Sequence, residues 1–124
     1  MIIKSCKQTP LQTVQMRGAR AVRMQVLLGR DESAPNFALR RFVVEPAGHT
    51  PRHQHLFEHE VFVLSGRGEV YDQQSGKRHP IAAGDAVLVP TNVVHQFINT
   101  GDEPLEFLCI VPLQQTDCQP VPGT

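Results

Sequence analysis

The sequence has no excess of charge of either sign. Its 12 lysine and arginine residues balance its 12 aspartate and glutamate residues, so the formal net charge is zero. Nucleic-acid-binding domains usually carry a basic patch or stripe, so we expect no nucleic-acid partner. No apolar stretch approaches the roughly 20 residues that a membrane span needs. The N-terminus also lacks the long apolar segment of a signal peptide. We therefore expect no membrane association.

Cysteine is scarce. The three residues Cys6, Cys109 and Cys118 are an odd number and do not have the spacing of a metal-binding motif. This usage favours a reducing compartment, so we expect a cytoplasmic protein. No Ser-His-Asp or Cys-His arrangement is evident, and the sequence assigns no catalytic side chain.

Internal repeats and strongly amphipathic helical windows are also missing, and short strand-like segments take their place. The 124 residues fit one domain. Turn-forming residues separate the segments predicted as strands, which are 21–28, 37–45, the histidine segment 53–55, 60–65, 69–72, 78–81, 86–89, 93–98 and 105–111. Many short strands at this spacing predict an all-β sandwich or barrel. We also expect a turn at residues 46–48 and a short edge strand at Ile2 and Ile3.

Histidine is concentrated in one place. Three of the six histidines, His53, His55 and His59, fall within seven residues, and His95 follows downstream. Residues two apart in a strand point to the same face, so His53 and His55 should aim their rings together. A single histidine is usually an ordinary surface or core residue, but neutral imidazole is also the commonest ligand of divalent transition metals. The cluster predicts that His53, His55, His59 and His95 bind one divalent ion per chain.

Two spaced motifs resemble those of the cupin superfamily. The first motif, G-x5-H-x-H-x3-E-x6-G, is matched by Gly48, His53, His55, His59 and Gly66; the second, G-x5-P-x-G-x2-H-x3-N, is matched by Gly84, Pro90, Asn92, His95 and Asn99. The resemblance covers roughly residues 20–112. It implies a double-stranded β-helix, that is, a jelly-roll barrel. Small single-domain bacterial cupins with four histidine ligands are the most similar group.

Three positions depart from these motifs. Gly48 stands one residue late, with Ala47 at the motif position, and Asn92 replaces the middle glycine of the second motif. Asn tolerates the left-handed backbone nearly as well as Gly, so that turn should survive. His59 replaces the usual glutamate and removes a negative charge, so the site should favour anionic ligands. The resemblance favours manganese, with iron, nickel, zinc or copper as alternatives.

Several further residues are candidates for the surroundings of the metal. Arg40 and Arg41 are adjacent in a strand, so either one points inward or both lie near a strand end and reach water. We expect Arg40, Thr50, Phe107 and Cys109 to line a pocket. The last two follow from the resemblance, and the alternative for Cys109 is a small core residue. Glu58 and Glu60 either hold a ligand in place by hydrogen bonding or are solvated.

The predicted organisation is an N-terminal arm at 1–19 that a dimer exchanges, a cupin domain at 20–112 and a flexible tail at 113–124. The resemblance implies a homodimer. The first functional hypothesis is a metal-dependent oxidoreductase of dioxygenase type that uses oxygen or peroxide on a small organic molecule, with anions favoured. The alternatives are a non-redox isomerase or lyase, and a small-molecule or sugar binding module without turnover.

Overall fold

The computed structural model describes residues 1–113 and 118–120, and this part of the chain is nearly all β-structure. Its elements in chain order are η1 (Cys6–Gln8), β1 (Gln12–Thr13), β2 (Arg20–Leu28), η2 (Arg30–Glu32), β3 (Phe37–His49), β4 (His53–His55), β5 (His59–Ser65), β6 (Arg67–Asp72), β7 (Lys77–Ala82), β8 (Ala86–Val89), β9 (His95–Asn99), β10 (Leu105–Pro112) and β11 (Cys118–Pro120). The short strands predicted from residue 20 onward are therefore present, with boundaries that differ by a few residues.

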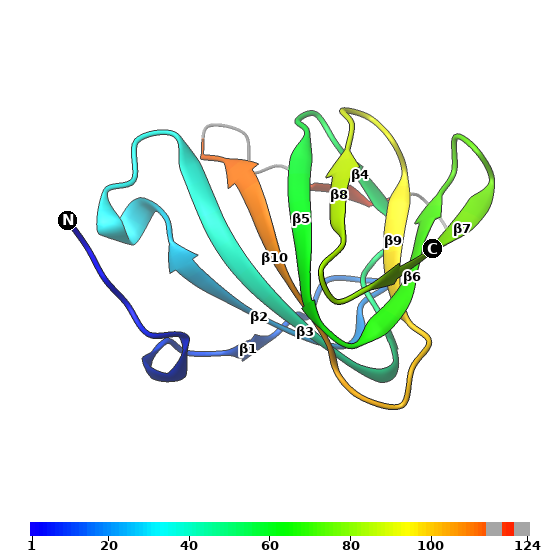
Figure 1. Ribbon diagram of the computed structural model, residues 1–124. Coiled ribbons are helices and arrows are strands. Elements are labelled where there is room, and N and C mark those ends of the chain that lie inside the picture. Colours follow the sequence, from blue (N-terminus) through cyan, green and yellow to red (C-terminus); the bar gives the residue numbers. More distant parts are fainter. Residues whose placement is uncertain (114–117, 121–124) are drawn as a thin grey trace.

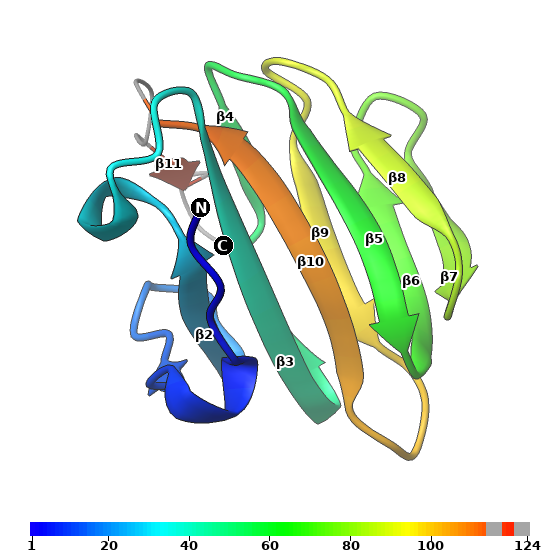
Figure 2. The same cartoon turned by 60° about the vertical axis from the view of Figure 1, so that its left-hand side comes forward.

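The strands form two antiparallel layers that curl around a common interior. β1, β2, β3, β10, β5 and β8 pair in one layer, and β7, β6, β9, β4 and β11 pair in the other. The layers join where β3 ends, because His49 pairs with Ile98 of β9. Figure 1 shows the curled sheet, and Figure 2 shows β3, β10 and β5 running side by side. This architecture is the predicted jelly roll.

Alternation along β5 separates an inner face from an outer one. Val61 and Val63 are 2% and 0% exposed, whereas Phe62 and Leu64 between and beside them are 46% and 42% exposed. Side chains of a strand point alternately to its two faces, so the first pair faces the interior. The outer face of this layer therefore carries exposed apolar side chains. The structure describes a single chain, and the homodimer stays a prediction.

The turn predicted at residues 46–48 is wrong, because β3 continues through it to His49. The strand bends instead of ending. Its pairing with β2 shifts between Val22↔Val44 and Arg20↔His49, and Ala47 takes a left-handed conformation with φ of 67°. A Cβ at Gly48 would lie 2.6 Å from the Arg20 carbonyl oxygen, so glycine permits this close approach. The bend carries the chain from one layer toward the other.

Replacing Ala47 with glycine should stabilise the protein. A non-glycine residue in the left-handed region costs about 1 kcal/mol, which glycine avoids, although glycine also gains entropy in the unfolded chain. We expect the free energy of unfolding in urea to rise by up to about 1 kcal/mol. Ala86→Gly is the matched control, since β8 holds that residue in ordinary strand conformation, and it should destabilise. Equal destabilisation by both variants would contradict the strain at Ala47.

The edge strand predicted at Ile2 and Ile3 is also wrong. Both residues lie outside any strand and are 53% and 89% exposed. The chain instead turns at η1, where the Ser5 hydroxyl accepts a hydrogen bond from the Lys7 backbone N–H, and the edge pairing begins later, at β1 beside β2. The buried Gln25 amide donates to the Cys6 and Thr9 carbonyl oxygens, so the arm packs on its own chain. Exchange of the arm in a dimer stays a prediction.

The predicted tail at 113–124 falls largely outside the described residues, and its flexibility stays a prediction. Within it, the Leu113 side chain is buried, and its backbone N–H donates to the Asn36 carbonyl oxygen. Cys118–Pro120 pairs with β4 as β11. Within residues 1–113 and 118–120, neither 3-10 helix has the length or the hydropathy that a membrane crossing requires.

Candidate metal centre

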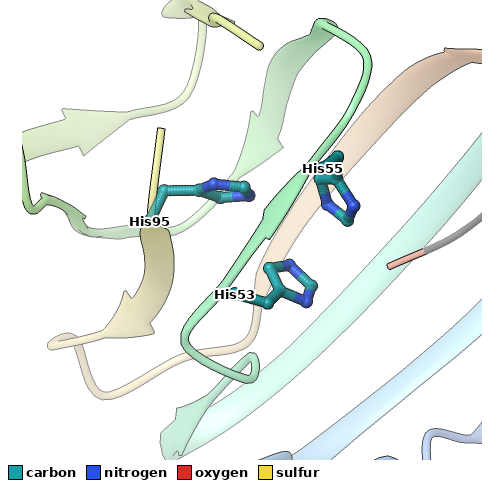
Figure 3. A group of neighbouring side chains, drawn as sticks. All are labelled: His53, His55 and His95. Atoms are coloured by element: carbon teal, nitrogen blue, oxygen red, sulfur yellow. The ribbon is translucent and has the colours of Figure 1, made fainter. Parts of the chain in front are cut away.

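Three strand segments bring four histidines together. His53 and His55 are two apart on β4, His59 begins β5 and His95 begins β9. β4 and β9 pair directly, with His53 opposite His95. Figure 3 shows His53, His55 and His95 on the adjoining strands, and one ring nitrogen of each lies within 4.8 Å of those of the other two. This set forms a candidate metal site.

His59 lies beside this set of three. Its Nε2 is 3.1 Å from His95 Nε2, and its ring centroid is 4.9 Å from that of His55. Two nitrogens that bind one ion side by side are about 3 Å apart, because metal–imidazole bonds are about 2.0–2.1 Å long. The His59–His95 separation therefore fits two ligands of one ion, and it also fits an N–H···N hydrogen bond.

The surroundings of His95 fix its tautomer. His95 Nδ1 lies 2.8 Å from the Val93 carbonyl oxygen, which can only accept, so Nδ1 carries the proton. Nε2 then presents its lone pair to the other histidines, as a metal ligand must. His59 Nε2 therefore donates to His95 Nε2, and its Nδ1 accepts from the Cys109 thiol at 3.1 Å. Each imidazole in this chain of contacts is neutral.

Burial keeps these imidazoles neutral. Desolvation is the largest cause of a pKa of about 3 for His53 and of about 2 for His59, and the nearby histidines add to both shifts. Desolvation also lowers the pKa of His95, although the hydrogen bond to Val93 acts in the opposite direction. Histidine must be neutral to bind a metal, so near pH 7 protons compete little for these three side chains. The donor set therefore fits a divalent transition metal.

The histidines line one part of a cavity of about 430 Å³ between the two layers. All four residues predicted for the pocket, Arg40, Thr50, Phe107 and Cys109, also line it. Thr50 Oγ1 accepts a hydrogen bond from the Phe97 backbone N–H at 2.9 Å. The Phe107 ring stacks on Phe42 at a centroid distance of 5.2 Å. Desolvation raises the pKa of the Cys109 thiol, and the nearby Arg40 partly opposes this shift.

The two adjacent arginines point in opposite directions. Arg40 lines the cavity, and its Nη2 donates to Cys109 Sγ at 3.3 Å. Arg41 faces outward, where it pairs with Glu106 and donates to the Gln25 side-chain oxygen. The alternative that both reach water near a strand end is wrong, because both lie well inside β3. The alternation of side chains along β3 therefore places the Arg40 guanidinium in the interior and the Arg41 guanidinium on the outer face.

Glu58 and Glu60 do not contribute to the cavity wall. Both are exposed, and alternation along β5 puts Glu60 on the face opposite His59. The structure therefore favours the solvated alternative for both carboxylates. Sequence reasoning missed the apolar lining residues Phe42 of β3 and Met24 and Val26 of β2. Phe42 lies two residues from Arg40, so the same strand parity identifies it once Arg40 is known to point inward.

The comparisons with known proteins decide the family. Residues 40–111 match the family model described as the cupin domain. The chain belongs to the cupin family. The matched segment contains all four histidines and Arg40, so the site of this cupin lies within the family domain.

Two relatives cover nearly the whole of this cupin. One is an oxalate-binding protein of Thermotoga maritima, 34% identical over 118 residues that make up 91% of this chain and 94% of the relative. The other is the solved structure of the polyketide cyclase RemF from Streptomyces resistomycificus, with 26% identity and a TM-score of 0.91 over 98% of this chain and 85% of that one. The different names of these two proteins show that relatives of similar fold serve different purposes.

A third relative matches over a shorter stretch. It is a 1-methylthio-D-xylulose 5-phosphate methylsulfurylase of Rhodospirillum rubrum, 38% identical over 73 residues. The match covers 59% of this cupin and 46% of the relative.

Proposed function

We propose that this cupin is a metal-dependent enzyme for a small organic molecule, an oxidoreductase of dioxygenase type that uses oxygen or peroxide. One divalent ion would be held by His53, His55, His59 and His95. The observation that carries the proposal is the convergence of neutral imidazoles on one cavity that is otherwise largely apolar. We also propose a cytoplasmic location, with which the free thiols of Cys6 and Cys109 agree.

The bound ion would supply a Lewis acid and a redox centre beside the substrate. His95 holds its Nδ1 proton on the Val93 carbonyl oxygen and offers Nε2 to the ion. To bind through Nε2, His59 would move its proton from Nε2 to Nδ1, and the Nδ1–H would then donate to Cys109 Sγ, with the imidazole neutral throughout. The resemblance favours manganese, although imidazole ligands also suit zinc, copper, iron and nickel. Phe42, Phe97 and Phe107 exclude water from one side of the cavity.

A non-redox reaction is the alternative, and the likeness to a polyketide cyclase over almost the whole chain favours it. In that case the ion would polarise a carbonyl group without a change of oxidation state. The likeness to an oxalate-binding protein favours the second alternative, binding without turnover.

Oxygen uptake separates the hypotheses. Protein reconstituted with Mn²⁺ or Fe²⁺ should consume oxygen or peroxide in the presence of a reactive aromatic or enolisable carboxylic acid, and product should form in proportion. The His55→Ala, His95→Ala double variant should lose this uptake, because its metal is gone. Product formation under anaerobic conditions and without added peroxide would contradict the dioxygenase proposal and support the isomerase or lyase. Tight binding of the same acids without any product would support the binding module.

A further inference from the structure

Arg40 brings a positive charge into the cavity without a matching negative charge. Its Nε is buried and has no hydrogen-bond partner among the described residues. No carboxylate of residues 1–113 forms an ion pair with its guanidinium, and its Nη2 donates to the Cys109 sulfur at 3.3 Å. Arg40 as a whole is only partly buried, but a buried N–H without an acceptor is costly unless a ligand compensates it. An anionic ligand would supply that compensation.

The guanidinium lies next to the histidine cluster. Cys109 Sγ contacts Arg40 Nη2 on one side and His59 Nδ1 on the other, so a single thiol separates the cation from the imidazole. The Arg40 guanidinium carbon also lies over the Phe42 ring, 5.1 Å from its centre, a cation–π contact that helps to hold the side chain in the cavity. A planar guanidinium held in this way can bind a carboxylate through two parallel hydrogen bonds.

The cavity beyond Arg40 is apolar. Val26 and Met24 of β2 pair with Arg40 and Phe42 of β3, and all four line the cavity. Among the described lining residues the other charged groups are Arg30 and Asp31, which are both exposed in η2. Methionine side chains adapt to ligands of different shape. A cavity of about 150 Å³ already holds benzene, so about 430 Å³ leaves room for one or two rings together with an acid group.

We infer that the ligand of this site is an organic monocarboxylate with an apolar, ring-sized body. Arg40 binds the carboxylate beside the histidine cluster, and the body packs on Met24, Val26 and Phe42. The inference names the substrate class for the proposed function and shares its cavity, but anion binding at Arg40 does not require turnover. Oxalate is the informative contrast, because it carries two charges and no apolar body.

Calorimetric titration with phenylacetate, benzyl alcohol and oxalate tests the inference, on protein stripped of metal and on protein loaded with Zn²⁺. Phenylacetate should bind at least tenfold more tightly than benzyl alcohol, because the alcohol has no carboxylate to pair with Arg40. Phenylacetate should also bind at least tenfold more tightly than oxalate, because oxalate has no ring to fill the apolar part of the cavity. Arg40→Met should weaken phenylacetate at least tenfold and leave benzyl alcohol within twofold. Arg40→Lys should bind phenylacetate with intermediate affinity, because lysine keeps the positive charge but cannot form the two parallel hydrogen bonds of a guanidinium.

Arg78→Met is the control, since that arginine is exposed on β7 and does not line the cavity. It should leave all three affinities unchanged. Equal affinity of the wild type for phenylacetate and benzyl alcohol would overturn the anion site even if Arg40→Met does not fold. Oxalate binding as tightly as phenylacetate would overturn the inference that the ligand has an apolar body. Phenylacetate binding to the metal-free protein, together with no product from the Mn²⁺- or Fe²⁺-loaded protein in the oxygen-uptake experiment, would leave this inference standing and overturn the enzyme proposal instead.

Discussion

Replacing both His55 and His95 with alanine should reduce the divalent metal content from near one ion per chain to background. These two side chains are 5% and 2% exposed and come from the two paired strands that hold the site. Loss of a residue that only orients a metal ligand already costs about 10–100-fold in affinity. Loss of two direct ligands should therefore weaken binding by more than about a hundredfold. Elemental analysis of protein purified without a tag measures this directly.

The matched control changes two histidines outside the cluster. His49 contacts Gln96 and Thr50, and His79 is exposed on β7 near Asp72. The His49→Ala, His79→Ala double variant has the same number of histidines as the test variant, so nonspecific binding to histidine falls equally in both. It should keep its metal. Equal loss of metal from both double variants would remove the evidence for this site.

The metal-free protein should lose stability steeply as the pH falls below about 6.5, the ordinary pKa of histidine in an unfolded chain. His53 and His59 have folded-state pKa values of about 3 and about 2, so between these values and pH 6.5 the unfolded state binds more protons than the folded state. The stabilising contribution is fully present above pH 6.5 and is lost as the pH falls toward the folded-state values. Two such groups cost about 3 kcal/mol per pH unit, which by pH 4.5 rivals a typical total stability.

Urea denaturation of chelator-treated protein at several pH values measures this slope. The His53→Gln, His59→Gln variant is the comparison, since glutamine does not titrate, and its stability should fall less steeply over the same interval. Bound metal should shift the loss to lower pH, because the ion binds only the folded, deprotonated site. A wild-type stability that stays constant between pH 6.5 and 4.5 would contradict the buried, neutral state of these imidazoles.

Local patterns predicted the elements and the histidine cluster well, because both depend on residues close together in sequence. The alternation of β5 and the spacing of His53 and His55 depend only on strand geometry. The conformation of Asn92 was also predictable from the local sequence, because its φ of 62° is the left-handed conformation expected at that motif position. The four histidines adjoin one another as predicted, whereas their joint binding of one ion stays a proposal.

Features that depend on pairing between distant strands could not be predicted from the sequence. Ala47 carries the positive φ at the position where the motif has glycine, yet residues 46–48 bend a continuous strand, and only the register with β2 reveals this. The contact of His59 with Cys109 depends on the pairing of β5 with β10. The inward direction of Arg40 depends on which face of β3 meets the second layer. The sequence left two alternatives open for the adjacent arginines, that one of them points inward or that both reach water, and it did not identify which one would point inward.

The most direct test of the central claim is the anomalous scattering of a crystal grown with Mn²⁺ or Co²⁺ and measured at the absorption edge of the metal. We expect one strong peak per chain, about 2 Å from a ring nitrogen of each of His53, His55, His59 and His95, and facing the cavity that Arg40 lines. A peak bound by the other three histidines, with His59 Nε2 too far from the ion to bind it, would remove His59 from the ligand set. A crystal with no ion at the cluster, or with an ion bound only elsewhere, would contradict the account.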